Sequence, residues 1–187
     1  MSTCIYVPAG SLWAKISGRL LRARLLRYAM RALIVLALFL SSTPAWAGEP
    51  ISIAGPARAI DGDTLWVGET QVRLQGIDAP ELDQTCRTRK GRSQNCGKMA
   101  RQALARLVLR QRVSCKGGAR DRDGRLIAVC RLGPFRINEQ MVMDGWALAH
   151  GDGGAAFIRA QSFAKARREG IWRSTFVMPW EWREGMR

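Results

Sequence analysis

The most constraining feature of the sequence is a run of short apolar segments separated by tight turns, which begins shortly after residue 50. Asp61-Gly62 is a tight-turn dipeptide, and Gly68-Glu69 marks a second turn. The segments that these turns separate are apolar enough to form strands. We therefore predict strands at residues 51–60, 64–67 and 71–77.

The remainder of the chain combines a loop with further strands and helices. Polar residues 82–97, bracketed by cysteines, predict a loop, and apolar residues at helical spacing predict a helix over 98–110. Two later helices are predicted at 138–144 and 155–169, and two later strands at 113–115 and 126–130. Five strands interrupted and followed by helices favour an α+β fold, a five-stranded OB-type β-barrel with three helices.

The first 47 residues have the organisation of a secretory signal peptide. The apolar run 32–40 follows three arginines and precedes Ala45-Trp46-Ala47, an A-x-A cleavage site. The run is too short to span a bilayer, and no polar face interrupts it as in an amphipathic helix. Met30 is an alternative start, because it would begin a signal of ordinary length. We expect cleavage after Ala47 and a periplasmic or secreted protein without stable membrane association.

Residues 48–187 remain after cleavage, which is enough for one domain with a modest core. Their aromatic tail, residues 178–183, is expected to pack on the body. The whole chain has a formal net charge of +15, and the leader holds six basic residues and no acidic one, so +9 remains. Such a charge attracts polyanions, namely nucleic acid, acidic polysaccharide or anionic lipid. A basic surface that serves only solubility is the alternative.

Four cysteines remain outside the leader, and an even number in an exported chain is typical of disulfides. We predict the pairs Cys86–Cys96 and Cys115–Cys130, each of which closes a short loop. The sequence has one histidine, His150, and no C-x-x-C pair, so a zinc site is not expected.

Three aspartates stand at predicted turns and strand ends. Asp61 and Asp63 flank the turn residue Gly62, and Asp78 follows the third predicted strand, where the Ala79 carbonyl is also available. Carboxylate and carbonyl oxygens are the ligands that Ca²⁺ prefers. The alternative is that the first pair only marks a turn and that Asp78 is only a cap.

Two arginines and a glutamate add the chemistry of a phosphate site. Arg73 lies shortly before Asp78, and Arg125 ends a predicted turn. Guanidinium groups match the oxygens of a phosphodiester and the charge that spreads over them during displacement. Glu81, held behind Pro80, is suited to accept a proton from an attacking water or to orient that water. A surface ion pair between Arg73 and Glu81 is the alternative.

In their order and spacing, these residues resemble the staphylococcal nuclease family. The resemblance spans residues 51–172 and rests on an ordered set of short motifs. The motifs are Asp61-Gly62-Asp63-Thr64, Arg73-Leu74 with Ile77-Asp78-Ala79-Pro80-Glu81, Asp123-Gly124-Arg125, Asn138-Glu139 with Gly145-Trp146-Ala147, and Gly170-Ile171-Trp172. The cysteines and the aromatic tail resemble an exported bacterial branch of that family.

The resemblance implies a monomeric, Ca²⁺-dependent nuclease that cleaves DNA and RNA, with single-stranded or denatured nucleic acid preferred. By position, it assigns Asp63 and Asp78 as direct Ca²⁺ ligands together with the Ala79 carbonyl. Asp61 would be a more distant carboxylate of the same site.

The resemblance also assigns Glu81 as general base or water-positioning residue, and Arg73 and Arg125 as the groups that bind the scissile phosphate. Two departures concern recognition. The best-known members have a tyrosine at the position of Asp123. They have further tyrosines in the segment that corresponds to residues 149–154, which contains no tyrosine here. Stacking contributes about 1–3 kcal/mol per base, so affinity or substrate choice is expected to differ. The alternative function is a non-catalytic OB-type module that binds nucleic acid or acidic exopolysaccharide.

Overall fold

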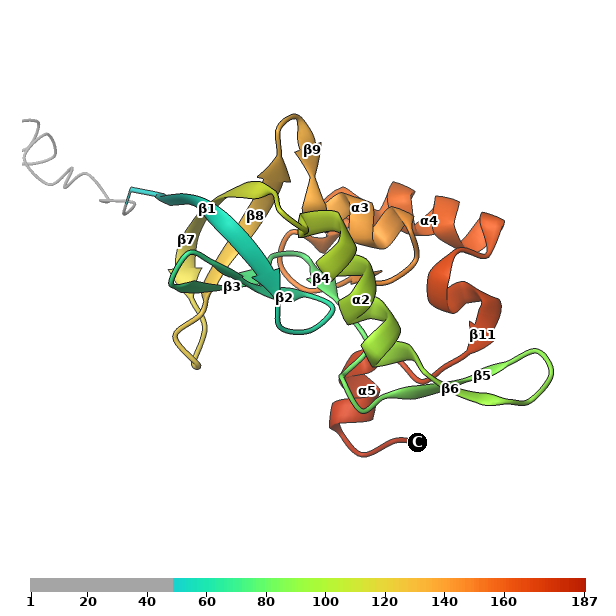
Figure 1. Ribbon diagram of the computed structural model, residues 1–187. Helices are drawn as coiled ribbons and strands as arrows, with labels where there is room; N and C mark the ends of the chain where they lie inside the picture. The colour runs from blue at the N-terminus through green and yellow to red at the C-terminus, as the bar shows by residue number, and fades with distance from the viewer. Residues whose placement is uncertain (1–48) are drawn as a thin grey trace, which may run out of the picture. The chain divides into compact units, whose positions relative to one another are not determined.

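The computed structural model describes residues 49–187, in which five strands close into a barrel (Figure 1). These strands are β1 (Ile51–Ala59), β2 (Thr64–Val67), β3 (Thr70–Leu74), β7 (Arg112–Arg120) and β8 (Leu126–Leu132). Antiparallel pairing runs in the order β3, β2, β1, β7, β8, and β3 also pairs in parallel with β8. The parallel pair closes the barrel, and the predicted fold class is confirmed.

The predicted signal peptide (1–47), its cleavage site and the alternative start at Met30 lie outside the described residues. They stay predictions, as does the periplasmic or secreted location that depends on them. Within residues 49–187, no helix combines the length and the apolar character needed to cross a bilayer.

The barrel interior is filled by side chains that alternate with exposed ones along the strands. On β7, for example, Val113 and Cys115 are buried and their neighbours are exposed. The first described helix, α2 (Cys96–Val108), packs on this core through a buried stripe. It begins two residues earlier than predicted because the Asn95 side chain caps it, accepting the Lys98 backbone N–H at 2.7 Å.

The third predicted strand is shorter than expected. β3 ends at Leu74, and the chain turns at Gly76, whose φ of 77° favours glycine. Ile77–Asp78 then forms β4, which pairs with β10 (Leu148–Ala149) outside the barrel sheet. The turn brings the Asp78 carboxylate to 2.9 Å from the Arg73 guanidinium. The break in the strand therefore builds part of the site.

Two helices in the second half lie near their predicted positions. α3 (Ile137–Met143) follows the short strand β9 (Phe135–Arg136), and α4 (Ile158–Arg167) packs against α3. The chain enters α4 through a 3₁₀ turn, η1 (Gly154–Phe157), so this helix is shorter than the prediction of 155–169. A second 3₁₀ turn, η2 (Gly170–Arg173), follows it.

The prediction of a loop over residues 82–97 is wrong. This segment contains β5 (Thr85–Thr88) and β6 (Ser93–Asn95), which form a hairpin that is extended by β11 (Ser174–Thr175). The Cys86–Cys96 disulfide joins the hairpin to the start of α2, and Cys115–Cys130 joins β7 to β8. Both predicted disulfides are present.

The C-terminal tail packs on the body, as predicted. It ends in the short helix α5 (Pro179–Arg183), whose Trp182 side chain is buried. The Trp182 indole Nε1 donates to Asp83 Oδ1 at 3.2 Å, and the Gln84 side-chain amide donates to the Val177 carbonyl at 2.7 Å. These contacts fix the tail against the segment that follows β4.

Candidate active site

One open cavity of about 410 Å³ gathers six of the seven predicted site residues. It is lined by Asp61, Asp63, Arg73, Ala79, Glu81 and Arg125, together with Arg183. The seventh residue, Asp78, has a fully buried side chain that contacts two of the lining arginines, Arg73 and Arg183. The structure thus assembles the predicted set around a single hollow, and the roles of its members stay predictions.

Close packing at Gly62 holds the turn that carries the first two aspartates. A Cβ at this position would lie 2.6 Å from the Ala79 Cβ and 2.8 Å from the Ala100 Cβ, so only glycine fits between them. Within the turn, the Asp63 backbone N–H donates to Asp61 Oδ1 at 2.9 Å. The turn is therefore fixed between the end of β4 and helix α2.

Asp63 is the carboxylate most strongly affected by its surroundings. It is buried and accepts hydrogen bonds from Arg73 Nη1 at 3.0 Å and from the Ala79 backbone N–H at 2.9 Å. Burial raises the pKa of Asp63 to about 7 against the opposing effect of Arg73, and the charges of Asp61 and Asp78 also raise it. A cation bound nearby would favour the ionised form.

Asp78 and Glu81 are joined by an arginine that the sequence did not point to. Arg183 Nη1 lies 3.0 Å from Asp78 Oδ1 and 2.6 Å from Glu81 Oε1, and Arg183 Nη2 lies 2.8 Å from Asp78 Oδ2. Arg73 instead pairs with Asp63 and Asp78. The surface pair between Arg73 and Glu81, considered above as the alternative, is therefore not formed.

Arg125 reaches the cavity from another element, the turn between β7 and β8. Its Nε donates to Asp121 Oδ2 at 2.7 Å, and its Nη2 donates to Asp123 Oδ2 at 2.8 Å. Burial acts to raise the pKa of Asp121, but the hydrogen bonds from Arg125 outweigh it and hold that pKa below its ordinary value. Asp123 thus brings a negative charge to Arg125.

The donor set fits a hard divalent cation, although its oxygens already have partners. Among residues 49–187, no three acidic, histidine or cysteine side chains are arranged to hold a metal ion. Asp63 pairs with Arg73, and Asp78 pairs with both Arg73 and Arg183. Carboxylate oxygens packed together, with one pKa raised by burial, are nevertheless the environment that a Ca²⁺ ion stabilises.

An aromatic pair joins the residue after β10 to the tail, in the segment where the sequence predicts a changed recognition surface. His150 stacks on Trp180, with ring centroids 4.3 Å apart and an angle of 13° between the planes. The tail therefore contributes a large aromatic ring beside the segment 149–154. Sequence spacing alone does not indicate this pairing.

The family model described as "Staphylococcal nuclease homologue" matches residues 71–174, more than half of the chain. The chain belongs to the staphylococcal nuclease family. The matched range contains most of the cavity residues, including Arg73, Glu81 and Arg125. The family membership predicted from the motifs is thereby confirmed.

Three curated relatives show how this family member is related to others. Succinoglycan biosynthesis protein ExoI of Rhizobium meliloti (strain 1021) is 36% identical over 143 residues, 75% of this chain and 74% of that protein. Protein ParB of Escherichia coli is 35% identical over 178 residues, 83% of this chain and 92% of that protein. Probable staphylococcal-like nuclease CAN4 of Oryza sativa subsp. japonica is 30% identical over 129 residues, 67% of this chain and 24% of that longer protein. The family model and the staphylococcal-like nuclease of Oryza sativa support a nuclease activity.

Proposed function

We propose that the protein is a Ca²⁺-dependent nuclease that hydrolyses phosphodiester bonds of DNA and RNA with little sugar or sequence specificity. The observation that carries this proposal is the shared cavity, in which Arg73, Glu81 and Arg125 meet a cluster of aspartates. Family membership supports phosphodiester hydrolysis as the reaction class.

The two arginines are suited to hold a phosphate from two sides. Arg73 extends from β3 and Arg125 from the β7–β8 turn, and their side chains keep 27% and 22% of their surface exposed. A guanidinium group donates two parallel hydrogen bonds to phosphate oxygens and stabilises the charge that develops there. In this proposal both arginines bind the scissile phosphate and remain bound through the transition state.

Glu81 is suited to the proton transfer. Its carboxylate is partly exposed to the cavity, and its backbone N–H donates to Gln84 Oε1 at 3.1 Å. The preceding Pro80 restricts the backbone at this point. Glu81 would accept the proton of the attacking water, or orient that water for attack in line with the leaving oxygen.

Asp63, Asp78 and the Ala79 carbonyl would hold Ca²⁺, with Asp61 close by. When bound, the ion would supply positive charge next to the phosphate oxygens. Asp63 is buried and its pKa is raised. The protein would hold this carboxylate in place, and the bound ion would favour its ionised form.

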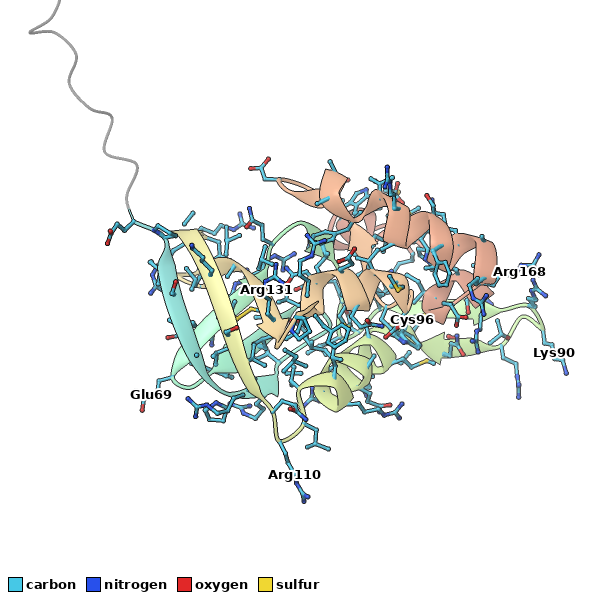
Figure 2. All side chains as sticks on the ribbon, turned by 90° about the horizontal axis from the view of Figure 1, so that it is seen from above. Glu69, Lys90, Cys96, Arg110, Arg131 and Arg168 are labelled. Carbon is cyan, nitrogen blue, oxygen red and sulfur yellow. A yellow bond between two sulfur atoms is a disulfide. The ribbon has the colours of Figure 1, made fainter. Side chains whose placement is uncertain are left out.

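A basic segment of the chain supports a nucleic-acid substrate. Residues 84–120 contain eleven lysines and arginines and no acidic residue, and all eleven are exposed. Lys90 at the tip of the β5–β6 hairpin and Arg110 beyond the end of α2 both point away from the body (Figure 2). The contact of Ala100 with Gly62 places α2 directly behind the aspartate turn. Exposed basic side chains in this number attract the phosphate backbone of a nucleic acid.

Little sequence specificity is expected because the cavity presents charged groups that match phosphate. Contacts to the phosphate backbone position a nucleic acid without reading its bases. His150, which is exposed and stacked on Trp180, would add a contact that is tolerant of the base.

The experiment is an assay of the purified protein on denatured DNA, on RNA and on an acidic exopolysaccharide, with Ca²⁺ or with excess chelator. We expect both nucleic acids to be cut to short fragments with Ca²⁺, no cleavage with chelator, and no action on the polysaccharide. A protein that binds DNA or polysaccharide without cutting any of them would instead be a non-catalytic binding module. The name of the R. meliloti relative, a succinoglycan biosynthesis protein, makes the polysaccharide arm worth including.

We also propose that the protein acts outside the cytoplasm, after removal of residues 1–47. Sequencing of the mature N-terminus is expected to begin at Gly48. An intact N-terminus on the mature protein would contradict export by cleavage.

A further inference from the structure

The C-terminal tail delivers one arginine to the carboxylates of the site. Trp182 is buried and hydrogen-bonded to Asp83, and the residue after it, Arg183, extends into the cavity. Hydrogen bonds to Asp78 are the largest influence on the pKa of Arg183 and raise it above its ordinary value, with further help from Glu81 and against the effect of burial. This guanidinium is therefore a fixed positive charge in the place where the proposed function needs a cation.

Both oxygens of Asp78 are engaged by arginines in this arrangement. Its Oδ1 accepts from both Arg73 and Arg183, and its Oδ2 accepts from Arg183. Its side chain is 0% exposed, whereas the Arg183 side chain is 42% exposed. When a cation takes Asp78, the guanidinium is therefore the partner that can move aside, because the carboxylate is enclosed on its other sides.

We propose that Arg183 couples cation binding to phosphate binding: it is the counter-ion of Asp78 and Glu81 in the free protein, and it binds the substrate phosphate once a cation has replaced it. This inference rests on the proposed function. When no phosphate is present, the cation and Arg183 compete for Asp78. A guanidinium that is displaced from Asp78 then has no new partner, which weakens cation binding. A bound phosphate supplies that partner, so cation and nucleotide should each strengthen the binding of the other by the same factor.

The test is a calorimetric titration of the purified protein with CaCl₂, first without nucleotide. Arg183→Gln removes the competing charge, and we expect this variant to bind Ca²⁺ about tenfold more tightly than the unmodified protein. This factor corresponds to the free energy of one hydrogen bond between charged groups, which the cation no longer has to break. Arg183→Lys keeps a charge with fewer donors and should fall between the two. The matched control is Arg187→Gln, because Arg187 belongs to the same tail but contacts backbone carbonyls and the Trp182 ring.

The titration is then repeated with saturating thymidine 3′,5′-bisphosphate, which carries phosphates but no diester bond to hydrolyse. We expect the nucleotide to tighten Ca²⁺ binding by about fivefold or more in the unmodified protein and in Arg187→Gln, and to have little effect in Arg183→Gln. Circular dichroism of each variant checks that the fold is kept, and the intermediate behaviour of Arg183→Lys keeps the test valid if the glutamine variant is misfolded.

The outcomes separate this inference from the proposed function. If the unmodified protein binds Ca²⁺ and nucleotide but Arg183→Gln binds Ca²⁺ no more tightly and keeps the same coupling, Arg183 is only a structural ion pair and the inference is wrong. If neither the unmodified protein nor any variant binds Ca²⁺, the proposed function itself is overturned, and the inference with it.

Discussion

The two sides of the cavity are built in different ways. On the carboxylate side, Arg73 and Arg183 hold Asp63, Asp78 and Glu81, and the contact between Arg183 and Glu81 joins residues that are 102 positions apart. On the turn side, Arg125 binds two aspartates that precede it by at most four positions. The first side depends on the tertiary fold, and the second is a local device of one turn.

This difference predicts which substitutions change the stability of the protein and which change only its activity. Asp63 and Asp78 are buried, so removal of an arginine that neutralises them leaves charge in a poorly solvated place. The partners of Arg125 are more exposed, and Asp123 keeps 58% of its side-chain surface in solvent. We therefore expect loss of an arginine on the carboxylate side to change both stability and activity, and loss of Arg125 on the turn side to change activity alone.

The largest effect is expected for Glu81→Gln. Loss of the proton acceptor should lower the cleavage rate of denatured DNA by about 10²–10⁴-fold. Because Glu81 is partly exposed and glutamine can still accept from Arg183, the melting temperature should stay close to that of the unmodified protein. A variant that keeps more than half of the activity would remove Glu81 from the proposed mechanism.

The next largest effect is expected for Arg125→Gln on the turn side. Loss of one guanidinium from the developing charge should lower kcat by about 10²-fold. The free energy of unfolding should change by no more than about 0.5 kcal/mol, since the ion pairs that are lost are partly solvated. Denaturant unfolding and steady-state kinetics on the same sample test both parts. A clear loss of stability would mean that the turn side is not a merely local device.

Arg73→Gln is the matching change on the carboxylate side. It leaves Asp63 without its ion pair, while Asp78 keeps Arg183. Because Arg73 is partly exposed and solvent screens its charge, we expect a moderate loss of about 2 kcal/mol in unfolding free energy together with reduced cleavage. If Arg73→Gln and Arg125→Gln prove equally stable, the contrast between the two sides is wrong.

The smallest effect is expected for Asp123→Asn. The substitution removes an exposed partner of Arg125 and leaves Asp121 in place. A freer guanidinium should lower KM for denatured DNA by roughly two- to threefold, the range of an exposed ion pair, with kcat unchanged. An increase in KM would indicate that Asp123 positions Arg125 and does not compete with the phosphate.

Sequence reasoning found the parts of the site that local spacing encodes. The turn with Asp61 and Asp63, the strand end with Asp78, and the Arg125 turn each lie within a few residues, and the closed barrel brings them to one cavity. Arg183 could not be found in this way. No periodicity links the tail to Glu81, and the arginine lies there because the tail packs on the segment that follows β4.

The errors in secondary structure have similar causes. The strands of the β5–β6 hairpin are short and polar, and in β5 only Cys86 is buried. They lack the apolar alternation that predicts strands, so the sequence predicts a loop there. The third predicted strand includes Gly76. In the structure this glycine has a left-handed conformation and lies in the turn between β3 and β4. In both places the strands also pair with a segment distant in sequence, β5 with β11 and β4 with β10.

The most direct test of the account is a crystal structure of the protein with Ca²⁺ and thymidine 3′,5′-bisphosphate. We predict one phosphate within hydrogen-bond distance of both Arg73 and Arg125, with the ion on Asp63 and Asp78. A nucleotide bound elsewhere on the molecule, with the cavity still closed by its internal ion pairs, would contradict the claim that the two sides act on one phosphate.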